Sequence, residues 1–439
     1  MKLTRALLAL SWATPVLAQY AGPAILTRGD APSAMAVPQI SFRPFAEITG
    51  VYDTGLTAAG STASQGELGN LTSYGVEFTA GISGVHTWAH TRLGLDYKGS
   101  IDRYAKNTAY DNSNQSLLLG ITHEFSRHTT LAVRESAGQF SRSYGLLGLS
   151  QTATFDPSSG YTPTSDFYDN RTIYLSTQVD FTIQKSARLS FDLGADGYLN
   201  RRQSTALYGM TGGGARGDVQ YRFTRNTTLG VAYSYNKYAY HGVFSGTDTH
   251  SLVVTYGVRL TRQLEISTYG GALREETQFV QPIVINPAIA FLLGLPGGAV
   301  IVHRVDYLPS LSARASYTMR RGVASISGGH SVTPGNGLFL TSTATNGNAN
   351  YSYTGLRRWS FSAGANYGRS KSIGNVLGTY GGTSETLSMS RQIGRFVHIV
   401  ANFSVRQYYS PSFQNYNRLI YSARLGLGFT PGDIPLRIW

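Results

Sequence analysis

The sequence predicts an all-β fold, a transmembrane antiparallel β-barrel, and two observations support this prediction. Apolar and polar residues alternate along segments of about ten to fourteen residues, the length that a tilted strand needs to cross a bilayer. In residues 419–429, for example, one face carries Leu, Tyr, Ala, Leu, Leu and Phe, and the other carries Ile, Ser, Arg and two Gly. A short turn motif also recurs between these segments. The alternation indicates strands that face lipid on one side and water on the other.

The recurring turn has the form apolar residue, Ser or Thr, then Arg. It occurs in Phe125–Leu131, Phe223–Leu229, Leu260–Leu264 and Met389–Ile393. Each copy ends one alternating segment and begins another after two to four residues, which is typical of a β-hairpin. Longer polar loops join the segments at their other ends. Short turns on one side and long loops on the other are the pattern of outer-membrane barrels.

The alternation predicts about eighteen strands, an even number that returns both termini to the periplasm. The segments near 206–223 and 322–355 are the least regular, so sixteen strands remain an alternative. The expected strands lie near 40–54, 72–84, 88–100, 114–125, 129–140, 170–183, 188–200, 206–223, 227–240, 248–260, 264–275, 305–318, 322–332, 343–355, 358–371, 382–391, 396–409 and 416–430. A β-propeller also repeats about every forty residues, but these strands are too long for its blades.

The first eighteen residues predict export. Lys2 and Arg5 precede the apolar stretch 6–13, and Val-Leu-Ala at 16–18 forms a cleavage site after Ala18. We therefore expect a signal peptide at 1–18, a short periplasmic segment at 19–39 and one barrel domain at 40–439. Residues 20–32 are expected to lie in the lumen, to bind a periplasmic partner or to be disordered. The segment 19–39 is too short to form a globular plug. The expected location is the outer membrane of a Gram-negative bacterium.

The composition supports this class. The chain has no Cys, 50 Gly, 29 Tyr and only 14% charged residues, below the roughly 25% of soluble domains. The net charge of +13 comes mainly from the predicted periplasmic turns, which contain no acid. These turns carry Arg127, Lys185, Arg225, Arg262, Arg320, Arg321, Arg357, Arg358, Arg391 and Arg395. Such a ring can bind phospholipid head groups. Nucleic acid is not expected, because the tyrosines lie at strand ends, as in a membrane girdle.

The polar phase of the strands predicts the residues that line a pore. The candidates are Arg92, Asp96, Lys98, Arg134, Asp180, Asp192, Asp196, Asp218, Arg222, Arg259, Asp306, Arg314, Arg406 and Arg424. Because both signs occur, these residues form either cross-strand ion pairs that satisfy the wall or a transverse field that guides a polar solute. Any anion preference is expected to be weak.

Residues 277–302 form a predicted outer loop without a charged residue. It could fold into the mouth as a constriction, with Phe279, Ile283, Phe291 and Leu293 as candidates, or contact a hydrophobic solute. A loop packed over the rim or at a subunit contact explains it equally well.

No catalytic, cofactor or metal site is predicted. Gly212, Gly214 and Gly217 match a dinucleotide fingerprint by letter, but glycines in a barrel wall explain them better. Asp248, His250 and His241 suit either a rim metal site or a solvated loop. His330 and Ser331 point to opposite faces of a strand and cannot pair directly.

With the export signal, these hairpins and the opening segments 42–45 and 50–56, the chain resembles the β-barrel porin 2 proteins over residues 40–439. Some of those proteins are linked with exopolysaccharide export. We therefore expect a porin-like channel for passive or weakly selective passage of small polar solutes. The alternatives are an envelope-complex component associated with polysaccharide export or secretion, and an outer-membrane enzyme. Expected partners are outer-membrane lipid and the barrel-assembly machinery, with an envelope protein or a second copy of the chain as further candidates.

Overall fold

Eighteen antiparallel strands form a single sheet in the computed structural model. The structure describes residues 43–54, 72–105, 111–140, 172–202, 208–283, 298–333, 340–353, 355–356, 358–373, 378–409 and 418–431. The strands are β1 (Arg43–Asp53), β2 (Ser73–Thr87), β3 (Thr91–Tyr104), β4 (Asn112–Ser126), β5 (Thr129–Phe140), β6 (Thr172–Gln184), β7 (Leu189–Arg202), β8 (Gly209–Arg222), β9 (Thr227–His241), β10 (Ser245–Arg259), β11 (Leu264–Ile283), β12 (Gly298–Met319), β13 (Gly322–Thr333), β14 (Ser342–Tyr353), β15 (Trp359–Ser372), β16 (Thr379–Gln392), β17 (Val397–Tyr409) and β18 (Arg418–Phe429).

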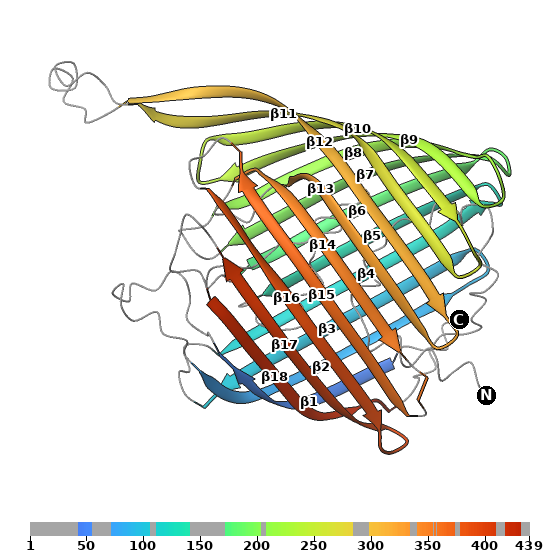
Figure 1. Cartoon of the computed structure of the whole chain (residues 1–439), viewed down its shortest axis with the longest axis vertical. Coiled ribbons are helices and arrows are strands. Elements are labelled where there is room, and N and C mark those ends of the chain that lie inside the picture. The colour runs from blue at the N-terminus through green and yellow to red at the C-terminus, as the bar shows by residue number, and fades with distance from the viewer. Residues whose placement is uncertain are drawn as a thin grey trace.

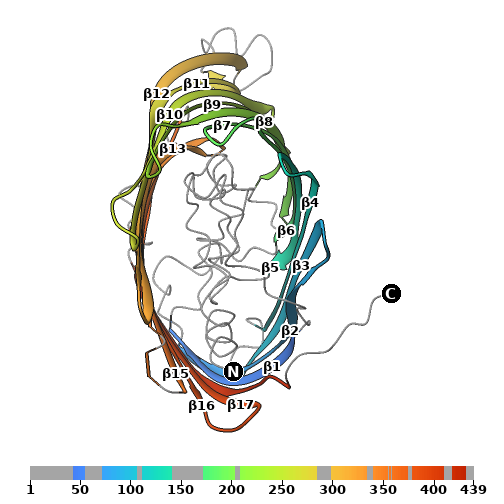
Figure 2. The same ribbon diagram turned by 90° about the vertical axis from the view of Figure 1, so that its right-hand side faces the viewer.

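The sheet closes on itself. Each strand pairs with the next one along the chain, and β18 pairs with β1 over a register that runs from Ala46↔Phe429 to Asp53↔Ser422. Figure 1 shows the tilted strands from the side, and Figure 2 shows the ring along its axis, with an oval outline. The predicted transmembrane antiparallel β-barrel of eighteen strands is confirmed, and the alternative of sixteen is wrong.

The two faces of the wall differ as the alternation predicts. On β18, Leu425 and Leu427 point outward and are 63% and 50% exposed, whereas the inward Ile420 and Arg424 are 3% and 7% exposed. The other strands repeat this pattern, with exposed large apolar side chains outside and polar ones inside. The sheet therefore presents an apolar surface to lipid and a polar wall to its interior.

The recurring Ser or Thr has a structural role in the short turns. The side-chain oxygens of Ser126, Ser186, Thr224 and Thr261 each accept a hydrogen bond from the backbone N–H two residues later, at 3.1 to 3.2 Å. This local bond replaces a backbone bond that the reversing chain cannot make. The next residue in three of these turns is arginine, so the motif fixes the turn and exposes a cation.

The predicted loop at 277–302 requires a correction. β11 continues to Ile283 and β12 begins at Gly298, and the two strands pair without interruption as far as Ile283↔Gly298. Figure 1 shows this hairpin extending beyond the ends of the neighbouring strands. The sequence was misleading because an uncharged run suits a strand of a long hairpin as well as an irregular loop.

Two further predictions concern the wall and the chain start. The glycines of the dinucleotide-like motif lie within β8, and a side-chain carbon at Gly212 would come within 2.2 Å of the Tyr198 hydroxyl. Close packing inside a barrel wall thus explains this glycine. The predicted signal peptide and the segment 19–39 lie outside the described residues. Among the described residues, no helix is long and apolar enough to cross a membrane.

Candidate solute-facing inner wall

The register places the predicted pore-lining side chains on the inner phase of their strands. On β3, for example, Arg92, Asp96 and Lys98 share one face with Asp102, and the exposed Tyr97 and Ile101 lie on the other. The same phase holds Arg134, Asp180, Asp192, Asp196, Asp218, Arg222, Arg259, Asp306, Arg314, Arg406 and Arg424. That these residues line an open pore remains a prediction.

The constriction candidates are placed differently. Phe279 lies in the β11–β12 ladder opposite Val302, and Ile283 ends β11. Phe291 and Leu293 lie outside the described residues. The constriction remains a prediction, and the segment between the two strands, 284–297, is where it would have to form.

A seam cluster lies where β18 closes against β1. We define it as Asp53, Glu77, Asp102, Tyr104 and Arg424. The Nε of Arg424 lies 2.6 Å from the Oε2 of Glu77, and the side chains are only 6% and 15% exposed. The Tyr104 hydroxyl donates a hydrogen bond of 2.6 Å to the Oδ2 of Asp53. Since β1 lies between β18 and β2, the ion pair joins two strands that are not neighbours and so ties the seam across three strands.

A second charged cluster lies on β5, β6 and β8. Asp180 accepts a short contact from Arg216, and the Arg134 guanidinium lies 3.6 Å from the other oxygen of this carboxylate. Gln178 also accepts a hydrogen bond from Arg134, at 3.4 Å. The two guanidinium groups thus share one carboxylate, so charges of opposite sign lie side by side on this wall.

A third polar group lies on β11 and β12. Glu275 is almost fully buried and accepts a hydrogen bond of 2.7 Å from the Thr277 hydroxyl. On the paired strand, Arg304 Nε lies 2.6 Å from the Oδ2 of Asp306. The register pairs Glu275 with Asp306 and Thr277 with Arg304, so the four side chains lie on the same face, one pair apart.

The interior also holds an apolar cluster against which a later segment packs. Tyr198, Met210, Tyr238, Tyr240 and Leu340 are buried together on and against the inner face of β7–β9. The Tyr240 hydroxyl donates to the backbone oxygen of Leu340. Leu340 precedes β14, which is five strands after β9 along the barrel wall.

Thr341 fixes the same segment to the wall. Its hydroxyl lies 2.7 Å from that of Thr247 and 3.0 Å from that of Tyr240, and the residue is fully buried. Residues 340–341 therefore lie against the inner face of β9 and β10.

The inner face of β13–β16 contains no charged residue. In these four adjacent described strands the inward positions are mainly Ser, Thr, Asn and Gly. Asn346, Asn348 and Asn350 alternate along β14, and Asn366 of β15 lies opposite Asn348. Asn350 donates a hydrogen bond to Asn348. We call this surface the amide wall. In Figure 2 it forms the long orange side of the oval, across from β3–β6.

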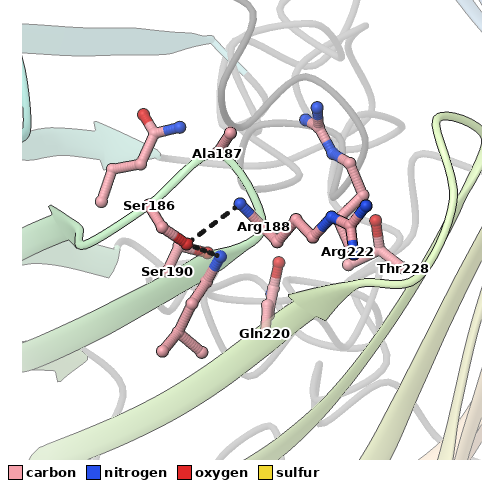
Figure 3. Close-up of a pocket in the computed structure, with 9 residues that line it drawn as sticks. Ser186, Ala187, Arg188, Ser190, Gln220, Arg222 and Thr228 are labelled. Atoms are coloured by element: carbon pink, nitrogen blue, oxygen red, sulfur yellow. Dashed lines mark hydrogen bonds between the residues drawn. The ribbon is translucent and has the colours of Figure 1, made fainter.

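A small pocket lies at the periplasmic end, between the β6–β7 and β8–β9 turns (Figure 3). The hydroxyl of Ser186 accepts hydrogen bonds from the backbone N–H groups of Arg188 and Leu189, at 3.2 and 3.0 Å. The backbone N–H of Arg222 donates a hydrogen bond of 2.8 Å to the backbone carbonyl of Arg188, so the backbones of the two arginines lie side by side. Two arginines therefore line this pocket.

The rim histidines lie in two paired strands, His241 at the end of β9 and His250 in β10. Asp248 and His250 lie on the outer face of β10, where Tyr235 donates to Asp248 at 3.0 Å and the Tyr233 hydroxyl lies 2.8 Å from the Nδ1 of His250. No group of three potential metal ligands occurs among the described residues. His330 lies on the outer face of β13 and Ser331 on the inner face, as predicted. The rim residues thus belong to an outward-facing aromatic band.

Sequence reasoning missed several inner-wall residues. Asp102 and Tyr104 were lost because the third strand was expected to end at residue 100, whereas β3 continues to Tyr104. Glu77 lies in the polar phase of a correctly predicted strand, between Val76 and Phe78, so the alternation could have identified it. Arg216 was available from the same signal. Thr341 gave no signal, because its partners are about a hundred residues away in the sequence.

Comparisons with known proteins add little to this geometry. No family model matches the chain, and no curated protein matches it. Among solved structures, the chain is similar to Pseudomonas aeruginosa OpdQ, with 11% identity over 90% of this chain and 98% of that chain and a TM-score of 0.41. It is also similar to Pseudomonas aeruginosa OccK2, with 11% identity over 89% and 97% and a TM-score of 0.42. For the ferric-catecholate import receptor Fiu of E. coli K12 the identity is 10%, the coverage 89% and 81%, and the TM-score 0.44. These values are too low to carry an argument about function, which rests on the barrel itself.

Proposed function

We propose that the chain forms an outer-membrane channel through which small polar solutes pass passively or with weak selectivity. The observation that carries this proposal is the closed sheet of eighteen strands, apolar outside and polar inside. Eight strands leave an interior that side chains fill, whereas sixteen to eighteen enclose an aqueous channel. An apolar exterior of this kind is stable only in a membrane, and closed barrels of this type are found in outer membranes.

The inner charges support weak selectivity. Arg216 and Arg134 share Asp180, and Arg424 pairs with Glu77. Paired charges produce a weaker field in the lumen than isolated ones, because each ion's field is largely cancelled at a distance. A strong preference for anions or cations is therefore not expected, despite the net charge of +13.

The family, the non-enzymatic role and the route of export are part of the same proposal. Kinship with the β-barrel porin 2 proteins rests on the turn motif and the signal segment, and a non-enzymatic role rests on the channel architecture. A role in a polysaccharide-export complex comes second, because β18 pairs with β1 of the same chain and the wall closes without a partner. Export by a signal peptide cleaved after Ala18 also remains part of the proposal.

Planar-bilayer recording on the purified mature chain tests the channel. We expect discrete conductance steps in KCl and a reversal potential close to zero in a tenfold KCl gradient. Bilayers that receive detergent alone are the control. Insertion without any conductance would contradict the proposal and favour a closed component of a larger complex. A reversal potential near the limit for one ion would contradict weak selectivity alone.

A further inference from the structure

We propose that the amide wall is the contact surface for neutral, polyhydroxylated solutes of the carbohydrate class. This inference rests on the proposed channel function and deepens it. The wall occupies four adjacent strands, β13–β16, and its inward side chains offer amides and hydroxyls without one charge. The amide wall is continuous across the four strands, from Ser325 and Ser327 of β13 to Ser384 and Thr386 of β16.

The hydrogen-bonding chemistry of the amide wall fits sugar hydroxyls. An asparagine amide presents two N–H donors and a carbonyl acceptor, and a serine hydroxyl both donates and accepts. A sugar hydroxyl also does both, so such a wall can meet it in many orientations. Asn346, Asn348 and Asn366 are half-buried on the inner face, so solute in the interior can reach part of each side chain.

The opposite wall does not compete for a neutral solute. Its charges on β5, β6 and β8 bind one another, as the contacts of Asp180 with Arg134 and Arg216 show. A charged group repays the loss of its hydration mainly by pairing with an opposite charge. A neutral sugar instead needs many ordinary hydrogen bonds, and these are what the amide wall supplies.

Current interruption by a neutral oligosaccharide tests this inference. A linear glucose hexamer added to one side of the bilayer should interrupt the KCl current briefly, because it binds the amide wall while it blocks the ions. In Asn348→Leu/Asn366→Leu the interruptions should shorten by about thirtyfold, since two lost hydrogen bonds of about 1 kcal/mol each amount to about 2 kcal/mol. Asn366→Leu alone is the milder variant if the double variant fails to fold.

Asn236→Leu is the matched control, because Asn236 is an inward amide on β9, outside the amide wall. Its interruptions should last as long as those of the wild type. Equal shortening in the control, no interruptions in the wild type, or longer interruptions by a carboxylated hexamer would each overturn the inference while leaving KCl conductance, and hence the channel, intact. A protein that does not conduct KCl would instead refute the channel itself.

A different observation carries a second proposal: the turn collar binds the phosphate groups of anionic phospholipids in the periplasmic leaflet. We define the turn collar as the exposed cations of the short turns, represented by Arg127, Arg225 and Arg262. The described residues of these turns contain no acid. Beside each of these three arginines stands an apolar side chain, Phe125, Phe223 or Leu260, which is 54% to 61% exposed.

This alternation suits a membrane interface. The apolar side chain can enter the acyl region while the arginine two residues later meets the phosphate level. Elsewhere on the collar, the guanidinium of Arg391 lies 5.0 Å from the centre of the Trp359 ring, and that of Arg395 lies 5.1 Å from the Phe396 ring. Aromatic rings beside cations are typical of side chains at head-group depth.

Lipid titration followed by native mass spectrometry tests the collar. We expect phosphatidylglycerol to stay bound to the detergent-purified barrel at concentrations where phosphatidylethanolamine and inorganic phosphate do not. The triple variant Arg127→Gln/Arg225→Gln/Arg262→Gln should need about fivefold more phosphatidylglycerol, since each of the three turns loses one cation worth on the order of 1 kcal/mol.

The control for the collar removes the same charge at the opposite rim. Arg201, Arg369 and Lys371 are exposed near the other ends of β7 and β15, and replacing them with Gln should leave lipid retention unchanged. Equal loss in the two triple variants would overturn the proposal, because it would mean that net charge and not the collar holds the lipid. Equal retention of inorganic phosphate would point to a free anion as the ligand and would overturn it as well.

Discussion

Removing the Arg424 charge should open the barrel at its seam. In Arg424→Met, Glu77 would stay buried on the inner wall without its guanidinium partner, near the carboxylate of Asp102 and with the hydrogen bond from the Thr79 hydroxyl at 3.1 Å. Both members of the pair are at most 15% exposed, so solvent cannot replace the lost contact. Breaking such a buried pair costs about 3 to 5 kcal/mol, because an uncompensated charge remains. We expect the free energy of unfolding to fall by this amount.

Urea unfolding in lipid vesicles, followed by tryptophan fluorescence, measures the change. The double variant Arg424→Met/Glu77→Leu is the matched control, because it removes both charges and should recover most of the loss. A loss below about 1 kcal/mol in Arg424→Met, or a double variant as unstable as the single one, would refute the idea that this ion pair holds the seam.

Three further predictions concern the wall, the turns and the interior. Gly271→Ala should destabilise the barrel by about 1 to 3 kcal/mol in the same assay, because the new carbon would lie 2.0 Å from the backbone oxygen of Leu252, whereas Gly120→Ala, with no atom within 4 Å, should be neutral. Thr261→Val should cost about 0.5 to 1.5 kcal/mol through the lost turn bond, and Thr261→Ser should not; equal loss in both would contradict the turn role. Thr341→Val should release residues 340–341 from the wall and raise single-channel conductance, and an unchanged conductance would show that this segment does not narrow the pore.

The sequence predicted the architecture because the signals for the strands and turns of a barrel are local in the sequence. Each strand repeats a period of two, and several of the short turns carry a Ser or Thr followed by Arg, so most elements could be identified within about fifteen residues. The errors arose where local signals are ambiguous. The uncharged run at 277–302 suits a long hairpin and a loop equally, and β3 extends past Ser100 because Ile101 and Asp102 continue the alternation.

The inner wall was only partly predictable for a different reason. The alternation that decides which side chains face inward is a local property of the sequence, so the inward placement of Arg134 and Arg424 could be predicted from it. Its contacts are not local: Glu77 and Arg424 are 347 residues apart, and Tyr240 and Thr341 are 101 apart. Such pairs depend on which strands become neighbours and on how far each is shifted along the next. A single sequence does not state that register.

The distribution of charge links the fold to the proposed transport. A chain with a net charge of +13 would be expected to conduct anions if the excess lay in the pore. The structure instead places a large share of the exposed cations on the short turns, whereas the inner wall carries acids and bases on β17, β18 and β1–β12 and no charge on β13–β16. Surface charge at the turns is screened within about 8 to 10 Å at physiological salt, so it reaches the centre of the channel weakly. The net charge is therefore better understood as a means of seating the barrel in its leaflet, and solute preference should follow the paired charges and the amide wall.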